Sequence, residues 1–364
     1  MAMEDWAIVV GITKYPGLTE LNGPERDALD FFSWVTSADG GGIDPASGRA
    51  KLIISSKCIP PPPYSDYIKA QPRMDDIIET LLELHSLALQ NLKNGDGRQA
   101  GRRLYLYFAG HGFTPSFPLG EQVALLTANS SEDVYGNHIP GTSWADWLWT
   151  SGYFEEILLF MDCCRDYKSG MAANPIVLGP PKLGGAAVKK RFYCFAAEWG
   201  KESWERKMPD GKIHGVFTTT LMTGLRGAAC DKSTGEITTV SLRSYLKQAM
   251  PFFFSEKDRN DPRIQKDPIV PDKGDGDFKI TEVKDIPTYQ ITINLPAEYQ
   301  NKPLQLISGS GAQMKITDLN GAGSKLTLTL PRASYTLKVK DEALVLGFEV
   351  KGIETQDATP KLDN

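Results

Sequence analysis

The chain of 364 residues has few cysteines and histidines, no long hydrophobic run and no excess of basic residues. Five cysteines are an odd number and too few for a disulfide scaffold, which indicates a reducing compartment and a cytoplasmic protein. Apolar runs such as residues 157–161 stop far short of the ~20 residues that a membrane span needs. The N-terminus lacks the basic start and the small-residue cleavage site of a secretory signal. With 40 Lys and Arg against 45 Asp and Glu, the chain also lacks the basic excess of most nucleic-acid-binding proteins. We therefore expect neither a membrane nor a nucleic acid as a partner.

The composition is that of a globular protein, with 41% hydrophobic and 23% charged residues, and the length suggests two domains. Up to about residue 280, short apolar runs alternate with segments of helical periodicity. The expected strands are residues 6–12, 51–55, 104–109, 156–161 and 191–197, and the expected helices begin near residue 24 and cover 74–92, 143–150, 216–225 and 241–250. This alternation predicts an α/β fold, in which a largely parallel sheet is flanked by helices on both faces.

The pattern changes after residue 284. Residues 288–295, 325–330 and 335–340 alternate polar and apolar side chains with a period of two, and Gly-rich turns separate them. A segment rich in Pro, Gly and Asp, residues 267–277, precedes this region. We therefore predict one domain over residues 1–284 and a small, β-sandwich-like accessory domain over residues 285–364. Its five or six antiparallel strands are a candidate surface for a protein partner.

Two of the expected strands end in residues suited to covalent catalysis. The third strand ends at Gly110-His111-Gly112, and the fourth ends at Asp162-Cys163-Cys164-Arg165. In an open parallel sheet, catalytic groups lie at the carboxyl ends of the strands. A histidine beside a cysteine raises the thiolate population that attacks a carbonyl, and can then protonate the leaving amine. The backbone N–H groups of Gly112 and Cys164 are candidates for holding the resulting oxyanion.

These residues resemble the caspase-like cysteine peptidases, which include caspases, metacaspases and paracaspases. His111 precedes Cys164 by 53 positions, close to the spacing of about 50 in the caspase signature Q-A-C-[RQG]-G. Cysteine and arginine match that signature, whereas Asp162, Cys163 and Asp166 depart from it; the Asp-x-Cys pattern is similar to that of metacaspases and paracaspases. Residues 23–28, 200–205 and 215–227 also resemble family segments, so the resemblance covers residues 6 to about 280.

The resemblance implies a cysteine endopeptidase that uses His111 and Cys164, without a cofactor or a metal. We favour Cys164 over Cys163 as the nucleophile because adjacent side chains at a strand end face opposite ways. Asp27, Asp162 and Glu205 lie at positions that resemble the acidic pocket of metacaspases and paracaspases. Three carboxylates in one pocket would bind Arg or Lys and reject Asp. The expected partner is therefore a protein or peptide substrate with a basic residue before the cleaved bond.

Several alternatives stay open from the sequence. Asp27 can be a favourable charge in the first turn of its helix, Glu205 a surface carboxylate, and His214 a competing base. The whole chain can be a catalytically silent scaffold that binds signalling partners, or a thiol hydrolase that is not a peptidase. By analogy with bacterial members of the family, the substrate can be a partner effector in a defence or cell-death pathway. The long loop of residues 166–190, with Lys189-Lys190-Arg191 at its end, is a candidate site of self-processing.

Overall fold

The computed structural model describes most of the chain. The described residues are 4–117, 122–164, 166–182, 185–186, 188–197, 204–208, 211–254, 261, 266–308, 315–342, 345–351 and 355–358. They divide into two compact units, which we describe separately. The first unit is Met1–Met222 with Thr238–Thr281, and the second is Thr223–Ile237 with Glu282–Asn364.

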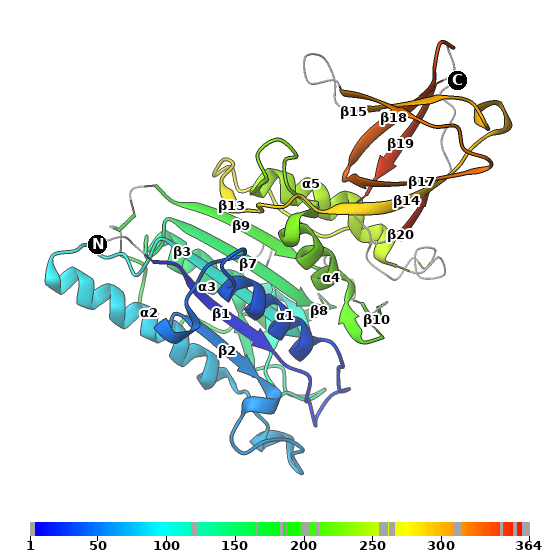
Figure 1. The fold of residues 1–364 in the computed structure, drawn as a ribbon. Coiled ribbons are helices and arrows are strands. Elements are labelled where there is room, and N and C mark those ends of the chain that lie inside the picture. The colour runs from blue at the N-terminus through cyan, green and yellow to red at the C-terminus, as the bar shows by residue number, and fades with distance from the viewer. Residues whose placement is uncertain are drawn as a thin grey trace. The chain divides into compact units, whose positions relative to one another are not determined.

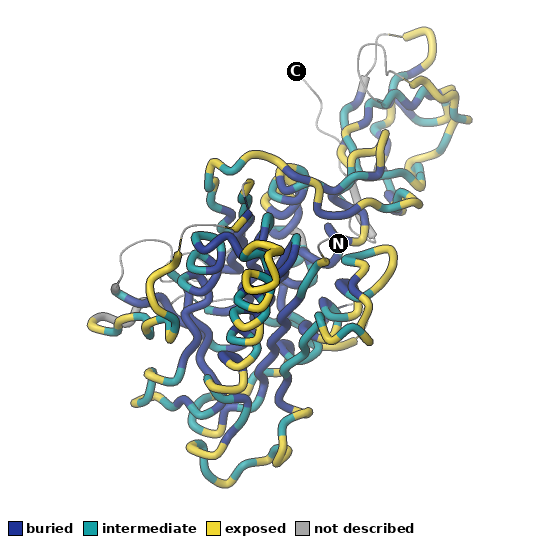
Figure 2. The backbone as a smooth tube through the Cα atoms, turned by 90° about the vertical axis from the view of Figure 1, so that its left-hand side faces the viewer, coloured by how far each residue is buried: buried dark blue, intermediate teal, exposed yellow. Residues whose placement is uncertain are grey.

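A five-stranded parallel sheet forms the centre of the first unit (Figure 1). Its order is β2-β1-β3-β7-β9, with the bounds β1 (Trp6–Gly11), β2 (Ala50–Ile54), β3 (Arg103–Gly110), β7 (Glu156–Cys163) and β9 (Lys190–Phe195). Every residue of β3 is buried, as expected of a strand that is covered on both faces. Figure 2 shows the inner strands of this sheet in the colour of buried residues along most of their length, whereas β2 at its edge is mostly half-buried. The predicted parallel sheet is confirmed.

Helices cover both faces of this sheet. On one face, α1 (Pro24–Thr36) stacks Phe31 on Tyr107 with ring centroids 4.6 Å apart, and α4 (Val216–Thr223) places the Thr218 hydroxyl 2.6 Å from that of Tyr107. On the other face, α2 (Met74–Asn94) and α3 (Gly141–Thr150) share a core with the β3 residues Leu104 and Leu106. The first unit also contains α5 (Thr239–Ala249). The expected helices are therefore confirmed, with ends shifted by a few residues.

A second sheet in the first unit was not predicted. Its order is β6-β5-β4-β8, with the bounds β4 (Gly112–Phe117), β5 (Ala124–Leu126), β6 (His138–Pro140) and β8 (Asp166–Ala172). The described residues of the chain also form two short strand pairs: β10 (Glu205–Lys207) with β11 (Ile213–Gly215), and β12 (Glu236–Thr238) with β13 (Lys279–Glu282). β4 follows β3 and β8 follows β7 along the sequence. The segment β3–β4 therefore stays paired with the segment β7–β8 beyond the carboxyl edge of the parallel sheet.

The second unit is built mainly of antiparallel strands. Its two sheets have the orders β17-β14-β20 and β16-β15-β18-β19, with the bounds β14 (Thr288–Asn294), β15 (Leu304–Ser308), β16 (Lys315–Leu319), β17 (Lys325–Pro331), β18 (Ala333–Val339), β19 (Val345–Val350) and β20 (Thr355–Ala358). These strands exceed the predicted five or six, and β20 pairs with β14 in parallel. The unit also includes Thr223–Ile237, which the sequence had assigned to the first domain. The division at residue 284 stays a prediction. Among the described residues, no helix is both long enough and apolar enough to cross a membrane.

Candidate active site

The register of the central strands brings His111 opposite Cys164. In the parallel sheet, Gly110 of β3 pairs with Cys163 of β7; in the second sheet, Phe113 of β4 pairs with Asp166 of β8. Both pairs are 53 residues apart, so the register is the same before and after the gap between them. Neighbouring strands lie about 4.8 Å apart. His111 and Cys164 occupy corresponding positions in that gap. They therefore lie on neighbouring segments of the chain, His111 between β3 and β4 and Cys164 between β7 and β8.

Of the two neighbouring cysteines, Cys163 is the last residue of β7 and Cys164 directly follows it. Cys163 is 1% exposed and belongs to the core that α2 and α3 cover. A Cβ atom added to Gly112 would lie 2.7 Å from the Cys163 Sγ atom, so this thiol packs directly against the glycine. Cys164 is half-buried, and period-two alternation continued past the end of β7 would turn it to the side opposite Cys163. This geometry favours Cys164 as the reactive thiol.

Two residues that the sequence did not identify hold His111 in place. The imidazole Nε2 atom lies 2.7 Å from the carbonyl oxygen of Thr19, which can only accept a hydrogen bond. The proton is therefore on Nε2, and Nδ1 keeps its lone pair. The Tyr15 ring meets the imidazole edge-on at 4.8 Å; its hydroxyl accepts from the His111 N–H at 3.1 Å and donates to the Leu126 carbonyl at 3.0 Å. Burial raises the pKa of Tyr15 well above its usual range, so the hydroxyl keeps its proton.

The glycines on either side of His111 are required by close packing. A Cβ atom on Gly110 would overlap the Tyr15 hydroxyl, and one on Gly112 would lie 2.7 Å from the carbonyl oxygen of Ala124. Gly112 pairs with Leu125 of β5, and the Leu126 N–H donates to the His111 carbonyl at 2.8 Å. In an antiparallel ladder this arrangement makes Gly112 a non-hydrogen-bonded position, whose N–H points away from β5. The Gly112 N–H is thereby directed toward the neighbouring segment on the other side of β4, which contains Cys164 and β8.

The three predicted acidic residues converge around two glycines. A Cβ atom on Gly23 would lie 3.0 Å from Glu205 Oε1 and 3.1 Å from Asp27 Oδ2. One on Gly215 would lie 3.1 Å from the same Asp27 oxygen and would overlap Asp162 Oδ2. Asp27 and Asp162 are buried, with 1% and 6% exposure, whereas Glu205 is half-buried. The structure thus gathers carboxylates from α1, β7 and β10 into one cluster, which we call the acidic cluster: Asp27, Asp162 and Glu205.

Hydrogen bonds fix the orientation of two of these carboxylates. Asp162 Oδ2 accepts from the Thr218 hydroxyl at 2.6 Å and from the Thr218 N–H at 3.2 Å. The two Glu205 oxygens accept from the N–H groups of Asn22 and Gly23 at 3.1 and 3.0 Å. Glu205 therefore ties β10 to the loop before α1, and the alternative of a freely solvated surface carboxylate is wrong for this residue.

Asp27 is bonded to β11. Its Oδ2 atom accepts from the Gly215 N–H at 2.8 Å, and its Oδ1 atom lies 2.7 Å from His214 Nδ1. Burial raises the pKa of Asp27 to about 7; the hydrogen bond from His214 opposes this rise, and the negative charge of Asp162 adds to it. The Asp27 carboxylate thus makes these hydrogen bonds to β11 and not to the first turn of its own helix. His214, the competing base, is a partner of Asp27.

The two remaining histidines have hydrogen-bond partners of their own. His138 is 1% exposed on β6, and its Nε2 atom accepts from the Asn174 N–H at 2.9 Å. His85 on α2 is bonded to the Tyr153 hydroxyl at 2.6 Å. Arg165 lies outside the described residues. Among the residues that are described, no group of three or more His, Cys, Asp or Glu side chains could hold a metal ion.

Comparisons with known proteins place this geometry in context. Residues 4–265 match the family described as the caspase domain. A protein named as a probable protease from a Desulfuromonadales bacterium is 27% identical over 228 residues, which are 62% of this chain and 26% of the relative. The chain thus spans about a quarter of that curated relative's length. Among solved structures, caspase-1 from Spodoptera frugiperda superposes with a TM-score of 0.43 and 12% identity, over 74% of this chain and 88% of that one.

Proposed function

This chain belongs to the caspase domain family, and from that membership we propose that it is a cysteine endopeptidase that cleaves proteins after Arg or Lys. The observation that carries the proposal is the constant register of 53 residues on both sides of His111 and Cys164. A thiol and an imidazole on neighbouring segments are the minimum pair of side chains needed for covalent hydrolysis of a peptide bond.

The first step is attack by the Cys164 thiolate on the peptide carbonyl. The Thr19 carbonyl keeps the proton of His111 on Nε2, so Nδ1 is the atom that accepts the thiol proton. A new S–C bond forms, and the carbonyl oxygen becomes an oxyanion. The N–H groups of Gly112 and Cys164 are assigned to that oxyanion, and the orientation of Gly112 away from β5 supports its part.

The second step releases the amine and then the acid. His111 Nδ1–H donates its proton to the leaving nitrogen as the C–N bond breaks, which leaves an acyl-enzyme on Cys164. A water molecule then attacks the thioester, His111 accepts its proton, and the carboxylic acid product leaves while the thiol is restored. No group outside the chain and water is needed for this balance.

The acidic cluster is assigned to the side chain before the cleaved bond. A guanidinium presents five donors in a planar fork that matches carboxylate oxygens, and a buried carboxylate is stabilised by a cation. Asp27 and Asp162 supply buried oxygens, while Glu205 stands at the more open side. An aspartate in the same place would add a further negative charge to the cluster, at a cost of several kcal/mol.

The biological substrate is proposed to be a protein partner, such as an effector of a defence or cell-death pathway, and the second unit is proposed to bind such a partner. Processing at Lys189-Lys190-Arg191 is less favoured. Arg191 stacks on Trp149 at 3.7 Å and pairs with Asp146 and Asp275, while the Lys189 ammonium donates to the Thr150 carbonyl at 3.2 Å. Cleavage there would first have to break these contacts.

Fluorogenic peptides that differ only in the last residue before the reporter test this function. We expect turnover of the Arg and Lys peptides at roughly a thousandfold higher kcat/KM than the Asp peptide, because several kcal/mol correspond to that ratio. Cys164→Ala should abolish turnover, and Cys194→Ala, which removes a buried thiol of β9, should not. A scaffold would give no turnover of any peptide and no labelling by a thiol-directed peptidyl-Arg probe. Preference for Asp would overturn the pocket assignment.

A further inference from the structure

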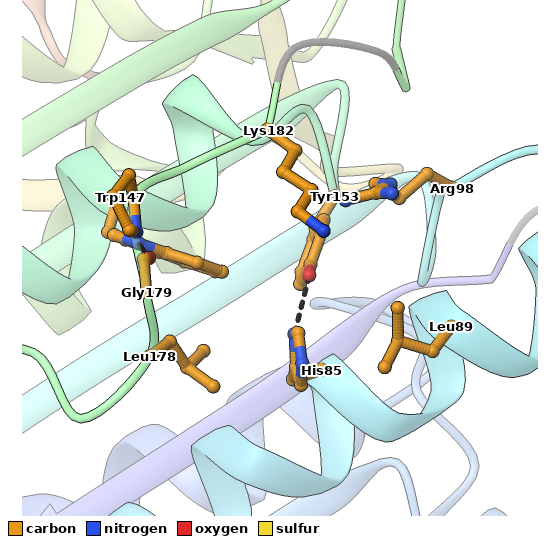
Figure 3. Close-up of a pocket in the computed structure, with 9 residues that line it drawn as sticks. His85, Leu89, Arg98, Trp147, Tyr153, Leu178, Gly179 and Lys182 are labelled. Carbon is orange, nitrogen blue, oxygen red and sulfur yellow. Dashed lines mark hydrogen bonds between the residues drawn. The ribbon is translucent and has the colours of Figure 1, made fainter.

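A second pocket lies on the α2 and α3 side of the central sheet, away from the face to which Cys164 and the acidic cluster are assigned. It encloses about 260 Å³. Figure 3 shows six of its side chains: His85, Arg98, Trp147, Tyr153, Leu178 and Lys182. They come from α2, the loop after it, α3, the loop between α3 and β7, and the segment between β8 and β9. The pocket is thus formed where a long connecting segment crosses two helices.

The pocket has a fixed aromatic wall. Trp147 meets Tyr153 edge-on with ring centroids 5.4 Å apart, and its indole N–H donates to the Gly179 carbonyl at 3.0 Å. Leu178 lies on the same side as Trp147 in Figure 3. Because the indole N–H is already bonded, the Trp147 ring offers only its apolar surface to a ligand. Such a wall suits a flat, apolar ring.

The charged side chains that line the pocket, Arg98 and Lys182, are both hydrogen-bond donors. Tyr153 is 1% exposed, and its hydroxyl is 2.6 Å from His85 Nδ1. A buried phenol donates to an acceptor within reach, which assigns the imidazole proton to Nε2. Figure 3 shows the ends of Arg98 and Lys182 turned toward the Tyr153 side of the pocket, above His85. Among the described residues, neither of these two cations has a carboxylate within 4.0 Å.

The charge of the pocket is positive. Of the described residues that line it, none is acidic. Burial lowers the pKa of His85, and the charges of Arg98 and Lys182 lower it further, so the imidazole is neutral while two full positive charges remain. An anion would satisfy both cations and the imidazole N–H, whereas a cation would find no acceptor of opposite charge.

We propose that this pocket binds a small aromatic anion, with its ring on the Trp147 and Leu178 wall and its acid group between Arg98 and Lys182. The volume lies just below the usual range of roughly 300–1,000 Å³ for ligand sites, which limits the ligand to one or two rings. A carboxylate and a phosphate share the required chemistry. The bound ligand would join α2 to the segment between β8 and β9.

Binding of matched probes to the full chain tests this proposal without any need for activity. The probes are 1-naphthoate, the neutral 1-naphthalenemethanol, and phenyl phosphate, followed by saturation-transfer NMR and calorimetry. We expect at least one of the two anions to bind saturably, and the neutral alcohol to bind at least tenfold more weakly than 1-naphthoate. Which anion binds more tightly distinguishes a carboxylate from a phosphate ligand.

Charge-removing variants locate the binding. Arg98→Ala and Lys182→Ala should each weaken the bound anion about tenfold or more, as expected for the loss of a charge-assisted hydrogen bond. Lys69→Ala, which removes an exposed lysine outside the pocket, should leave the affinity unchanged. Thermal melts of each variant control for folding. No saturable binding of either anion at millimolar concentration, equal binding of the neutral alcohol, or equal affinity in all three variants would each overturn the proposal.

Discussion

At the scale of single residues, the position of His111 depends on a hydroxyl rather than on a second charged group. The Tyr15 hydroxyl joins the His111 N–H to the Leu126 carbonyl, and its ring supports the imidazole from the side. Both backbone groups would lose this hydrogen bond in its absence. We therefore propose that Tyr15 is a positioning residue, which would act on the reaction through the geometry of His111.

We predict that Tyr15→Phe lowers both stability and turnover. Loss of the hydroxyl removes two buried hydrogen bonds, which should reduce the free energy of unfolding by about 1–3 kcal/mol. It should reduce kcat about tenfold with little change in KM, because substrate contacts are preserved. Urea denaturation and peptide kinetics measure the two effects. Tyr64→Phe, which removes a hydroxyl bonded to the Pro60 carbonyl near the surface, is the matched control. Equal losses in the two variants would contradict the positioning role.

The raised pKa of Asp27 predicts a specific pH dependence. Its pKa is about 7 in the folded chain against an ordinary value of 3.8, so the folded state binds more protons than the unfolded state between these values. Stability should therefore fall as the pH rises through this window. The cost of the ionised group is highest above the folded-state pKa, where the acidic cluster carries its full charge.

The variant Asp27→Asn tests this sign. The wild-type melting temperature should fall between about pH 5 and about pH 8, and the slope should be smaller in the variant. The wild-type KM for an Arg peptide should be higher at the lower pH, because protonation of Asp27 removes a charge from the cluster. Calorimetry and peptide kinetics at both pH values measure these changes. A melting temperature that rises with pH by the same amount in both proteins would show that Asp27 is ionised throughout.

Sequence reasoning predicted the candidate catalytic residues but not their supports. His111 and Cys164 were predicted because glycines, strand ends and family motifs mark them. Asp27, Asp162 and Glu205 were predicted through the resemblance, and they do lie together. Tyr15 and Thr19 carry no such mark: Thr19 contributes only its carbonyl, which any residue could supply. A contact across 92 residues between a loop carbonyl and an imidazole leaves no local pattern.

At the scale of elements, the site depends on the pairing of β4 with β8. Neither was predicted, since Gly112–Phe117 contains Pro115, and Asp166–Ala172 is polar and contains Gly170. These residue types disfavour strands when read locally. The strands form because the chains before them are already side by side in β3 and β7. Their pairing is thus a consequence of tertiary structure, which a local pattern does not contain.

The segment between β8 and β9 is fastened near its start by one side chain. The Asn174 amide donates to the carbonyls of Gly136 and His138 at 2.8 and 2.9 Å. This anchor restrains the segment at the point where it leaves β8 (Asp166–Ala172). Loss of two hydrogen bonds should raise the population of locally opened states about tenfold.

We predict that Asn174→Ala accelerates cleavage of this segment by trypsin. The experiment uses the Cys164→Ala background, so that self-processing does not contribute, and mass spectrometry assigns the cut to the segment between β8 and β9. The exposed Asn94, at the end of α2, provides the control Asn94→Ala. An equal cleavage rate in the two variants would mean that Asn174 does not hold the segment.

At the scale of the whole molecule, the second unit takes in a segment of chain from the middle of the sequence. The Val283 N–H donates to the Gly235 carbonyl, and a Cβ atom on Gly227 would overlap the Pro287 ring. The sequence predicted a simple boundary near residue 284 from the change in periodicity. Periodicity marks where β strands begin, but it cannot reveal which earlier segment they pack against.

Removal of residues 285–364 should therefore loosen Thr223–Ile237 as well. We predict faster hydrogen exchange in this segment of the truncated chain, because its packing against Pro287 is gone, while β1 and β7 in the buried sheet keep their protection. Exchange mass spectrometry of the full and truncated chains measures the difference. Unchanged protection of Thr223–Ile237 would show that the segment is held by the first unit alone.

At the centre of the proposed function is the activation of Cys164 by His111, and the rate of alkylation of each cysteine by iodoacetamide tests this activation most directly. The measurement needs no substrate, and peptide mapping assigns the modified thiol. We expect Cys164 to react fastest near neutral pH, Cys163 and Cys194 to stay unmodified in the folded chain, and His111→Ala to slow the reaction of Cys164 at least tenfold. Faster alkylation of Cys163, or a rate at Cys164 that is the same with and without the imidazole, would contradict the activation of Cys164 by His111.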